Sequence, residues 1–425
     1  MERLQALHGR TGRPPSMQHA LLLLDLDRFT TFNDARGSEM GDRLLCAVAL
    51  RLSEILPAQS LLVRVAGDEF AVVLHGLGVD VSLASRHALA FAAKLQATLL
   101  HPLRLEGDAQ DAQLGASYAG QAQPPLLVLV LGETGRSGNF GINGYERNTT
   151  PLLAARTDLV SARNAWSCGT STAASVPCMF SHLGRTGYEA RAANFESLID
   201  VLHHAGLAVL WVDNQSGCKG VCDRIGETLT SAPKSPTPDP ALCPGGECLD
   251  RVMLQDLDTR IAALPAEQRQ RGTVVVLHQM GSHGPAYYKR SAPDNKKFGP
   301  ECTSTSLQEC ERQQVVNAYD NSVVETDFFL DSVLKWLTAQ DSKAQTAMIY
   351  VADHGESLGE NNLYLHGLPY SIAPDVQKHV PWITWLSPAM QARTQVATGC
   401  LQHDLAERRI THDHYFHSVL GLMDV

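Results

Sequence analysis

The sequence predicts an α/β protein of two domains, in which a larger domain with a mostly parallel sheet follows a smaller α+β domain. The chain has 425 residues, which is enough for two domains. Apolar strand patterns alternate with helical patterns through the second part, as is typical of parallel sheets covered by helices. A small, polar stretch that ends in two prolines, residues 115–125, indicates a linker. We therefore expect domains at residues 1–120 and 121–425.

Four apolar runs in the larger part predict buried strands, and polar residues follow each of them. The runs are Leu126–Leu131, Ala208–Val212, Thr273–Leu277 and Ala347–Val351. Helical stretches lie between them, at Ala192–His204 and Val315–Leu337. Ligands of such sheets bind beyond the carboxyl ends of the strands. The polar residues at these ends are therefore the first candidates for a functional site.

Glu133, Asp353 and His354 stand at two of these strand ends. Carboxylate oxygens and imidazole nitrogens are ligands that zinc accepts. A hydroxyl could complete the ligand set and become a nucleophile there, because metal coordination lowers its pKa. Within the stretch SCGTSTAASVPCMF, residues 167–180, four candidate hydroxyls lie between the two cysteines: Thr170, Ser171, Thr172 and Ser175. Its small residues are typical of a helix start, where free N–H groups suit a phosphate.

Three further polar residues of the larger part are candidates for substrate contacts. His283 and His366 stand in glycine-rich loops, and each could bind a second metal or donate a proton to a leaving oxygen. Lys219 lies between two cysteines and could meet a phosphate as a point charge.

Cysteine usage favours an exported protein, whereas the lack of a signal peptide and of membrane-spanning segments does not. Eight of the ten cysteines form close sequential pairs between Cys168 and Cys310, while Cys46 and Cys400 stand alone. Close pairing favours disulfides and an oxidising compartment over a zinc ribbon. No apolar run is long enough to span a bilayer, and the first residues carry no signal-peptide core. Taken alone, these two observations predict a soluble chain that is not exported. The net charge of −10 argues against a nucleic-acid partner.

In the first part, the apolar pattern predicts strands at Ala20–Leu26, Leu61–Val65 and Phe70–Leu74, with a helix over Gly41–Leu56. Acidic residues end the first strand and form the turn between the other two. Their carboxylates could together hold a divalent cation.

The segments DLDRF and AGDEF, residues 25–29 and 66–70, resemble the motifs of the GGDEF family of diguanylate cyclases. The resemblance implies that the carboxylates of Asp25 and Glu69 hold Mg²⁺. It also implies that the side chains of Asn33 and Asp42 contact guanine. The opening and closing segments of that family are absent here. We expect a truncated, inactive remnant, and the alternative is a sensor of GTP or a cyclic dinucleotide.

The larger part resembles the catalytic domain of the phosphoethanolamine–lipid A transferases, a family that includes the mobile colistin-resistance enzymes. The matching segments are GETGRSGNFGINGYERNTTP, SCGTSTAASVPCMFS, WVDNQSGCKGVCDR, GSHGPAYYKR, ADHGESLGENNLYLHGLPY and KHVPWITWLS, in the order of the family. The resemblance implies the three-layer fold of the alkaline-phosphatase and sulfatase superfamily. A sulfatase proper should carry C/S-x-P-x-R at its nucleophile, and CGTST lacks that Pro and Arg.

The resemblance also implies a role for each candidate residue. Thr172 would accept the phosphoethanolamine group, and one tight zinc ion would be bound by Glu133, Thr172, Asp353 and His354. His283 and His366 would lie on the substrate side, where a second zinc could bind, and Lys219 would lie in the substrate pocket. Disulfides would join Cys168–Cys178, Cys218–Cys222, Cys243–Cys248 and Cys302–Cys310.

The reaction implied is the transfer of phosphoethanolamine from phosphatidylethanolamine to a lipid A phosphate of lipopolysaccharide, through a phosphothreonine. This is the chemistry of polymyxin and colistin resistance, at the periplasmic face of the inner membrane, and we expect a monomer. The family's membrane helices are missing from this sequence, where the GGDEF-like part takes their place. Two alternatives are another phosphotransferase or phosphatase of the superfamily, and a non-functional fusion.

Overall fold

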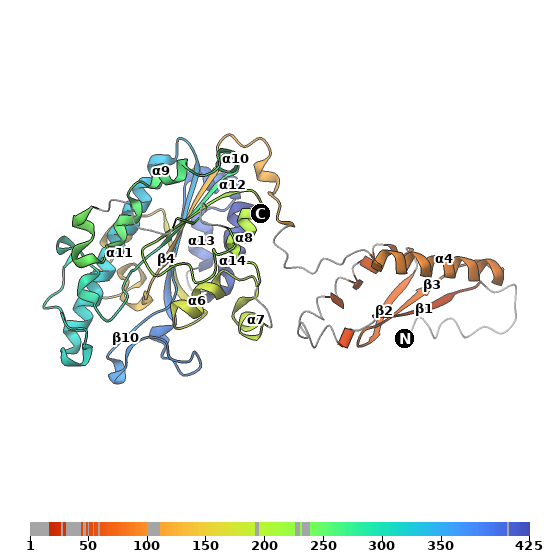
Figure 1. Cartoon of the computed structure of the whole chain (residues 1–425), viewed down its shortest axis with the longest axis horizontal. Coiled ribbons are helices and arrows are strands. Elements are labelled where there is room, and N and C mark those ends of the chain that lie inside the picture. Colours follow the sequence, from red (N-terminus) through yellow and green to blue (C-terminus); the bar gives the residue numbers. More distant parts are fainter. Residues whose placement is uncertain are drawn as a thin grey trace. The chain divides into compact units, whose positions relative to one another are not determined.

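The computed structural model describes most of the chain, namely residues 17–26, 29–30, 44–45, 48–49, 51–53, 55–57, 60–100, 111–191, 195–225, 230–231, 239–405 and 408–425. The chain folds as two compact units that divide near residue 108 (Figure 1). Across the described ranges, no helix combines the length and the apolar character that crossing a membrane requires. The domain boundary expected at residues 120 and 121 stays a prediction.

The first unit contains a three-stranded antiparallel sheet in the order β1-β3-β2. Its strands are β1 (Ala20–Asp25), β2 (Leu61–Ala66) and β3 (Glu69–Leu74). The turn of the AGDEF segment joins β2 to β3, and β3 pairs with β1 on its other side. The three predicted strands are therefore confirmed.

Helical residues supply the rest of the core of the first unit. Of the helix expected over residues 41–56, the described residues that reach the core, Leu45, Val48 and Leu52, are helical. Helix α4 (Val81–Leu100) is an element beyond those predicted, and its Leu95 packs with Phe70.

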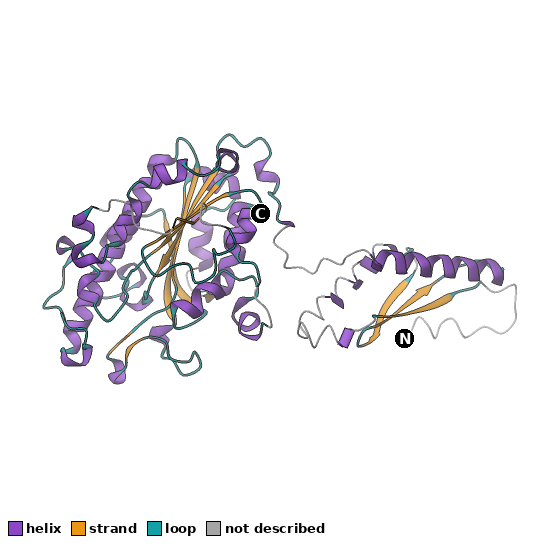
Figure 2. Ribbon diagram, in the orientation of Figure 1, coloured by secondary structure: helices purple, strands orange, loops and turns teal. Residues whose placement is uncertain are grey.

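The second unit is built around one sheet of eight strands, in the order β13-β5-β12-β9-β4-β8-β6-β7 (Figure 2). The strands are β4 (Pro125–Gly132), β5 (Leu159–Trp166), β6 (Ala208–Asp213), β7 (Thr230–Ser231), β8 (Thr273–His278), β9 (Gln345–Ala352), β12 (His379–Leu386) and β13 (Ile410–Thr411). Neighbours pair in parallel, except that β12 is antiparallel to both β5 and β9. The predicted mostly parallel sheet is confirmed.

The four predicted strands form the middle of this sheet, as β6, β8, β4 and β9. All eight residues of β4 are buried, because helices cover both faces of the sheet. Burial of each Leu or Val side chain stabilises the fold by about 1.5–3 kcal/mol. Strand β5 carries the polar residues Ser161, Arg163 and Asn164, so it lacks the continuous apolar run by which the central strands are recognised.

Helices flank the sheet on both faces, which completes the three-layer architecture. They are α5 (Pro151–Ala154), α6 (Thr172–Met179), α7 (Gly184–Ala190), α8 (Leu198–His204), α9 (Leu257–Ala262), α10 (Ala266–Arg271), α11 (Arg312–Gln340), α12 (Pro388–Thr394), α13 (Thr398–Leu405) and α14 (Tyr415–Met423). Figure 1 shows α11 on one side of the sheet and α8, α13 and α14 on the other. A separate hairpin joins β10 (Ser357–Leu358) to β11 (Tyr364–Leu365).

The two predicted helices of this part differ from the structure at their ends. The helix start expected at Ala192 lies outside the described residues, while residues 195–197 are not helical and α8 begins at Leu198. Ser197 caps it, since its hydroxyl accepts from Asp200 N while the Asp200 side chain accepts from Ser197 N. The other prediction, 315–337, lies within α11.

The four predicted disulfides are all present in the second unit. They join Cys168 to Cys178, Cys218 to Cys222, Cys243 to Cys248 and Cys302 to Cys310. The cysteines of these pairs therefore do not form a zinc ribbon. Cys400 is free and exposed, and Cys46 lies outside the described residues.

Candidate active site

Two neighbouring strands bring the predicted carboxylates and imidazole together. Strands β4 and β9 are parallel, and their register pairs Gly132 with Ala352. The residues that follow, Glu133 and the pair Asp353 and His354, therefore leave the sheet side by side at its carboxyl edge. All three side chains are buried, with residue exposures of 1%, 1% and 0%.

Thr172 completes this group from a different element, because it is the first residue of α6. Its Oγ1 donates to Glu133 Oε2 at 2.8 Å and lies 3.5 Å from His354 Nε2. Thr170 is turned away, since its hydroxyl donates to the carbonyl of Leu368. Of the four hydroxyls of this segment, Thr172 is the one that these contacts place at the carboxylates.

The donor atoms of this cluster fit a metal ion. One ligand atom each from Glu133, Asp353 and His354 lies within 4.8 Å of the others. Asp353 Oδ1 accepts from two backbone N–H groups, whereas its buried Oδ2 has no hydrogen-bond partner. His354 Nδ1 lies 2.8 Å from the carbonyl of Gly355, the arrangement that leaves Nε2 free to be a ligand. The orphaned carboxylate oxygen and the oriented ring are both what a metal site requires.

The electrostatics of the cluster also suit a cation. Burial alone would lower the pKa of His354, but the carboxylates of Asp353 and Glu133 raise it to about 10. Burial and the charge of Glu133 raise the pKa of Asp353. Burial would likewise raise the pKa of Glu133, yet its contact with His354 holds that pKa well below its usual range. Two buried carboxylates thus demand positive charge, which a proton or a metal ion can supply.

Helix α11 holds the loop that follows Glu133. Tyr319 Oη donates to the carbonyl of Thr134 at 2.7 Å and accepts from Arg136 N at 2.8 Å. Thr134 has a φ of 59°, a left-handed conformation that is rare for a β-branched residue. Its hydroxyl donates to Glu133 Oε1 at 2.6 Å. This unusual backbone, fixed by α11, orients the Glu133 carboxylate.

The two glycine-loop histidines both lie beside the cluster. The ring of His366 is 4.3 Å from that of His354 and 5.8 Å from that of His283, measured between centroids. His366 Nδ1 lies 3.2 Å from the carboxylate of Glu356, which is fully buried. Sequence reasoning missed Glu356, although it follows His354 by only two positions in ADHGES.

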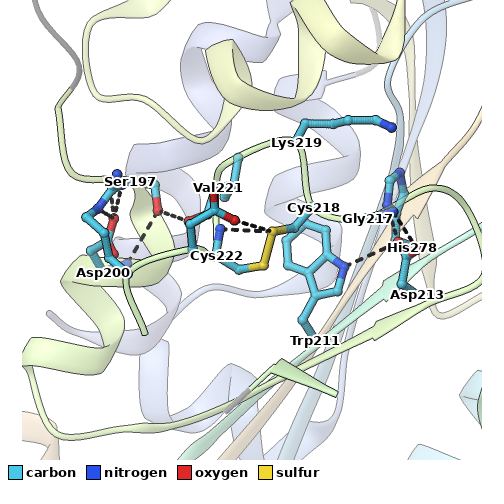
Figure 3. Close-up of a disulfide and its surroundings, with 12 residues drawn as sticks. Ser197, Asp200, Trp211, Asp213, Gly217, Cys218, Lys219, Val221, Cys222 and His278 are labelled. Atoms are coloured by element: carbon cyan, nitrogen blue, oxygen red, sulfur yellow. Dashed lines mark hydrogen bonds and ion pairs between the residues drawn. A yellow bond between two sulfur atoms is a disulfide. The ribbon is translucent and has the colours of Figure 1, made fainter. Parts of the chain in front are cut away.

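Lys219 reaches the cluster through a second residue that sequence reasoning missed. Its Nζ donates to Gln215 Oε1 at 3.3 Å and contacts Ser216, and Gln215 Nε2 donates to Glu133 Oε2 at 2.9 Å. The Cys218–Cys222 disulfide closes the loop that carries Lys219 (Figure 3). The only signal for Gln215 was its place just beyond the β6 strand end.

Not every polar strand end serves the cluster. Asp213, at the end of β6, lies 2.8 Å from Nδ1 of His278, at the end of β8 (Figure 3). Each of these residues follows an apolar run in the same way as Glu133 does. The pairing between them satisfies both side chains, so they form a structural contact beside the site.

The predicted residues of the first unit can be placed only in part. Asp25 and Glu69 face each other in the register of β1 and β3. Asn33 and Asp42 lie outside the described residues. Nothing in the described part of this unit supports Mg²⁺ binding beyond the resemblance itself, so these four assignments stay predictions.

Comparison with known proteins gives a family for each part of the chain. The sulfatase family model matches residues 125–425. The model of the GGDEF domain of diguanylate cyclases matches residues 2–124.

Curated proteins match the larger part of the chain. Phosphoethanolamine transferase EptA of Escherichia coli K12 is 43% identical over 317 residues, which are 74% of this chain and 56% of that protein. Phosphatidylethanolamine transferase Mcr-1 of E. coli is 41% identical over 73% of this chain and 56% of its own length. The chain thus spans about half the length of the curated relatives it matches.

A solved structure extends the likeness to the fold. The soluble domain of lipooligosaccharide phosphoethanolamine transferase A from Neisseria meningitidis matches with a TM-score of 0.69 and 42% identity, over 74% of this chain and 92% of that one. The sheet, the buried cluster at its carboxyl edge and these matches lead to one conclusion. Through residues 125–425, the chain belongs to the sulfatase family.

Proposed function

We propose that residues 125–425 catalyse the zinc-dependent transfer of phosphoethanolamine from phosphatidylethanolamine to a lipid A phosphate. The observation that carries this proposal is the position of Thr172, whose Oγ1 lies 2.8 Å from Glu133 Oε2 and 3.5 Å from His354 Nε2 in a buried cluster. The relatives at 41–43% identity are named as phosphoethanolamine and phosphatidylethanolamine transferases.

The zinc ligands in this proposal are Glu133, Thr172, Asp353 and His354. A bound zinc ion lowers the pKa of a hydroxyl and offsets negative charge on phosphoryl oxygens. The chain's own contribution is orientation, because Thr134 and Gln215 hold the two oxygens of Glu133 and the carbonyl of Gly355 holds the ring of His354.

In the first step, Thr172 Oγ attacks the phosphorus of the donor. A bond forms between Oγ and phosphorus, the bond from phosphorus to the glycerol oxygen breaks, and diacylglycerol leaves. Glu133 Oε2 already accepts the hydrogen bond of the hydroxyl and is placed to take its proton. His283 or His366, beside the cluster, would give a proton to the departing oxygen.

In the second step, an oxygen of a lipid A phosphate attacks the phosphothreonine. The bond from phosphorus to Thr172 Oγ breaks, the proton taken by Glu133 returns to Oγ, and phosphoethanolamine is left on the acceptor. Lys219, tied to the site through Gln215, supplies positive charge for the phosphates. The product carries a cationic amine over a lipid A phosphate, so cationic peptides such as colistin would bind the surface less well.

The proposed place of this reaction is the periplasmic face of the inner membrane. Four disulfides favour an oxidising compartment. The donor and the acceptor are both lipids, so the active edge of the sheet would have to meet a membrane. We propose that the chain works there as a monomer.

The test uses the full chain, purified under oxidising conditions with zinc and mixed with phosphatidylethanolamine in detergent. Intact-mass spectrometry should show one phosphoethanolamine adduct on the parent. Thr172→Ala should show none. Ser171→Ala is the matched control, because it removes the adjacent hydroxyl while leaving Thr172 in place, and it should still form the adduct.

An adduct on Thr172→Ala would overturn the assignment of the nucleophile. Release of free phosphoethanolamine into water, with no transfer to added lipid A, would instead favour a phosphatase of the same superfamily. A folded, zinc-loaded parent that forms no adduct and releases no product would contradict the proposed activity for this chain.

A further inference from the structure

His412 lies next to the segment of residues 167–172 that leads to the proposed nucleophile Thr172, the nucleophile segment. The proposed reaction does not use His412. It follows strand β13 near the end of the chain and is 1% exposed. Each of its ring nitrogens contacts a backbone group from a distant part of the sequence. Cys168 N donates to Nδ1 at 3.0 Å, and Nε2 lies 3.1 Å from the carbonyl oxygen of Ala352.

These two contacts determine which nitrogen of the ring carries the proton. A backbone N–H can only donate, so Nδ1 must accept from Cys168 and is unprotonated. A carbonyl oxygen can only accept, so Nε2 must carry the proton and donate it to Ala352. The ring is therefore neutral, and burial is consistent with this because it lowers the pKa of His412 to about 3.

The ring joins the two segments that make the cluster. Cys168 opens the segment that leads to Thr172, and its disulfide partner Cys178 lies within α6. Ala352 is the last residue of β9 and directly precedes Asp353. A bridge between Cys168 and Ala352 thus links the nucleophile segment to the strand that carries two of the proposed metal ligands.

Other hydrogen bonds of the nucleophile segment connect it to parts of the structure other than β9. Gly169 N donates to Ser175 Oγ at 2.8 Å, which closes the turn onto its own helix. Ser167 N donates to the carbonyl of Lys378, which ties the segment to β12 rather than to β9. The contact through His412 relates the backbone of this segment to Ala352, the last residue of β9.

We propose that His412 is a positioning residue, whose ring holds Cys168 against the end of β9 and so places Thr172 at the proposed metal ligands. This inference rests on the proposed function of Thr172 as the nucleophile. Displacement of a reacting group by about 1 Å can slow a reaction roughly 100-fold, so a lost bridge should be visible in the rate.

Three variants of the full chain separate the two contacts of the ring. His412→Asn offers an acceptor near the position of Nδ1 but does not reach Ala352. His412→Gln offers a donor near the position of Nε2 but leaves Cys168 N without an acceptor. His412→Ala removes both. His417→Asn, an exposed histidine on α14, is the matched control.

The first measurement is amide hydrogen exchange of peptides that cover residues 167–172, in zinc-loaded protein without substrate. We expect about ten-fold faster exchange in the Ala and Gln variants, and near-parental exchange in the Asn variant and the control. The second is the rate of adduct formation on Thr172. We expect roughly 10- to 100-fold losses for Ala and Gln, and a smaller loss for Asn. Zinc affinity should change far less than the rate.

Parental exchange and rate in the Gln variant would overturn the proposal, and so would equal losses in the Asn and Ala variants. Losses that simply follow the fall in unfolding temperature would show a general structural role and overturn it as well. The exchange measurement does not depend on turnover. A parent chain without adduct would therefore contradict the proposed function, while the exchange pattern would still decide whether His412 holds the segment.

Discussion

Asp250 provides a sharp test of how the turn beside the candidate site is held in place. It is 6% exposed and lies just after the Cys243–Cys248 disulfide. Its Oδ1 accepts from Met280 N at 2.7 Å and from the Asn214 amide at 2.9 Å. Its Oδ2 accepts from Gly281 N at 3.0 Å and from the Gln279 amide at 3.1 Å.

The turn that Asp250 holds is packed against the site. Gly281 has a φ of +50°, and a Cβ there would lie 2.5 Å from the carbonyl oxygen of Glu133. Ser282 N donates to that same oxygen at 3.1 Å, and the turn leads directly to His283. Loss of the carboxylate should therefore loosen both the Glu133 backbone and the His283 loop.

We expect Asp250→Ala to destabilise the second unit by about 3 kcal/mol. Asn214 keeps a partner in the carbonyl of Cys248, but the Gln279 amide and the N–H groups of Met280 and Gly281 lose their acceptor. Each buried donor left unpaired costs about 1–3 kcal/mol, and removal of a buried carboxylate returns part of that sum. The unfolding temperature should fall by roughly 6–10 °C.

Tryptophan fluorescence during urea or thermal unfolding is the suitable assay. All five tryptophans lie between residues 166 and 385, so the signal reports the second unit alone. Asp294→Ala, at an exposed position, is the control and should match the parent. A free energy of unfolding for Asp250→Ala within about 1 kcal/mol of the parent would refute the reasoning, because three unpaired donors, two of them in buried and one in a part-buried hydrogen bond, cannot cost so little.

Three further predictions concern the metal, pH and the nucleophile disulfide. Glu133→Gln should weaken zinc binding at least about ten-fold by calorimetry, since the site loses a charged ligand; unchanged affinity would contradict the ligand set. Burial raises the pKa of Asp327 from 3.8 to about 6, so the folded state binds more protons between these values and stability should fall by about 3 kcal/mol as pH rises through that window. Asp327→Asn should remove this part of the slope, and equal slopes would count against it. Replacement of Cys168 and Cys178 by serine should cost about 2–3 kcal/mol in chemical unfolding, because the bridge spans a separation of 10 residues, whereas Cys400→Ser should cost nothing measurable.

The central strands and the proposed metal ligands could be read from the sequence because their signals are local. Continuous apolar runs mark β4 and β9, since strands buried on both faces have no polar alternation. Glu133 and Asp353 stand directly after these runs, and parallel strands carry their carboxyl ends to one edge. The family motifs added the choice of Thr172 among four hydroxyls and the pairing of the cysteines.

Only the tertiary structure decided the contacts between segments that lie far apart in the chain. His412 meets Cys168 across 244 positions and Ala352 across 60, and Gln215 meets Glu133 across 82. Asp213 and His278 follow apolar strands just as Glu133 does, yet they pair with each other. The role of a buried polar side chain depends on its hydrogen-bond partner. When that partner comes from another strand, the local sequence does not identify it.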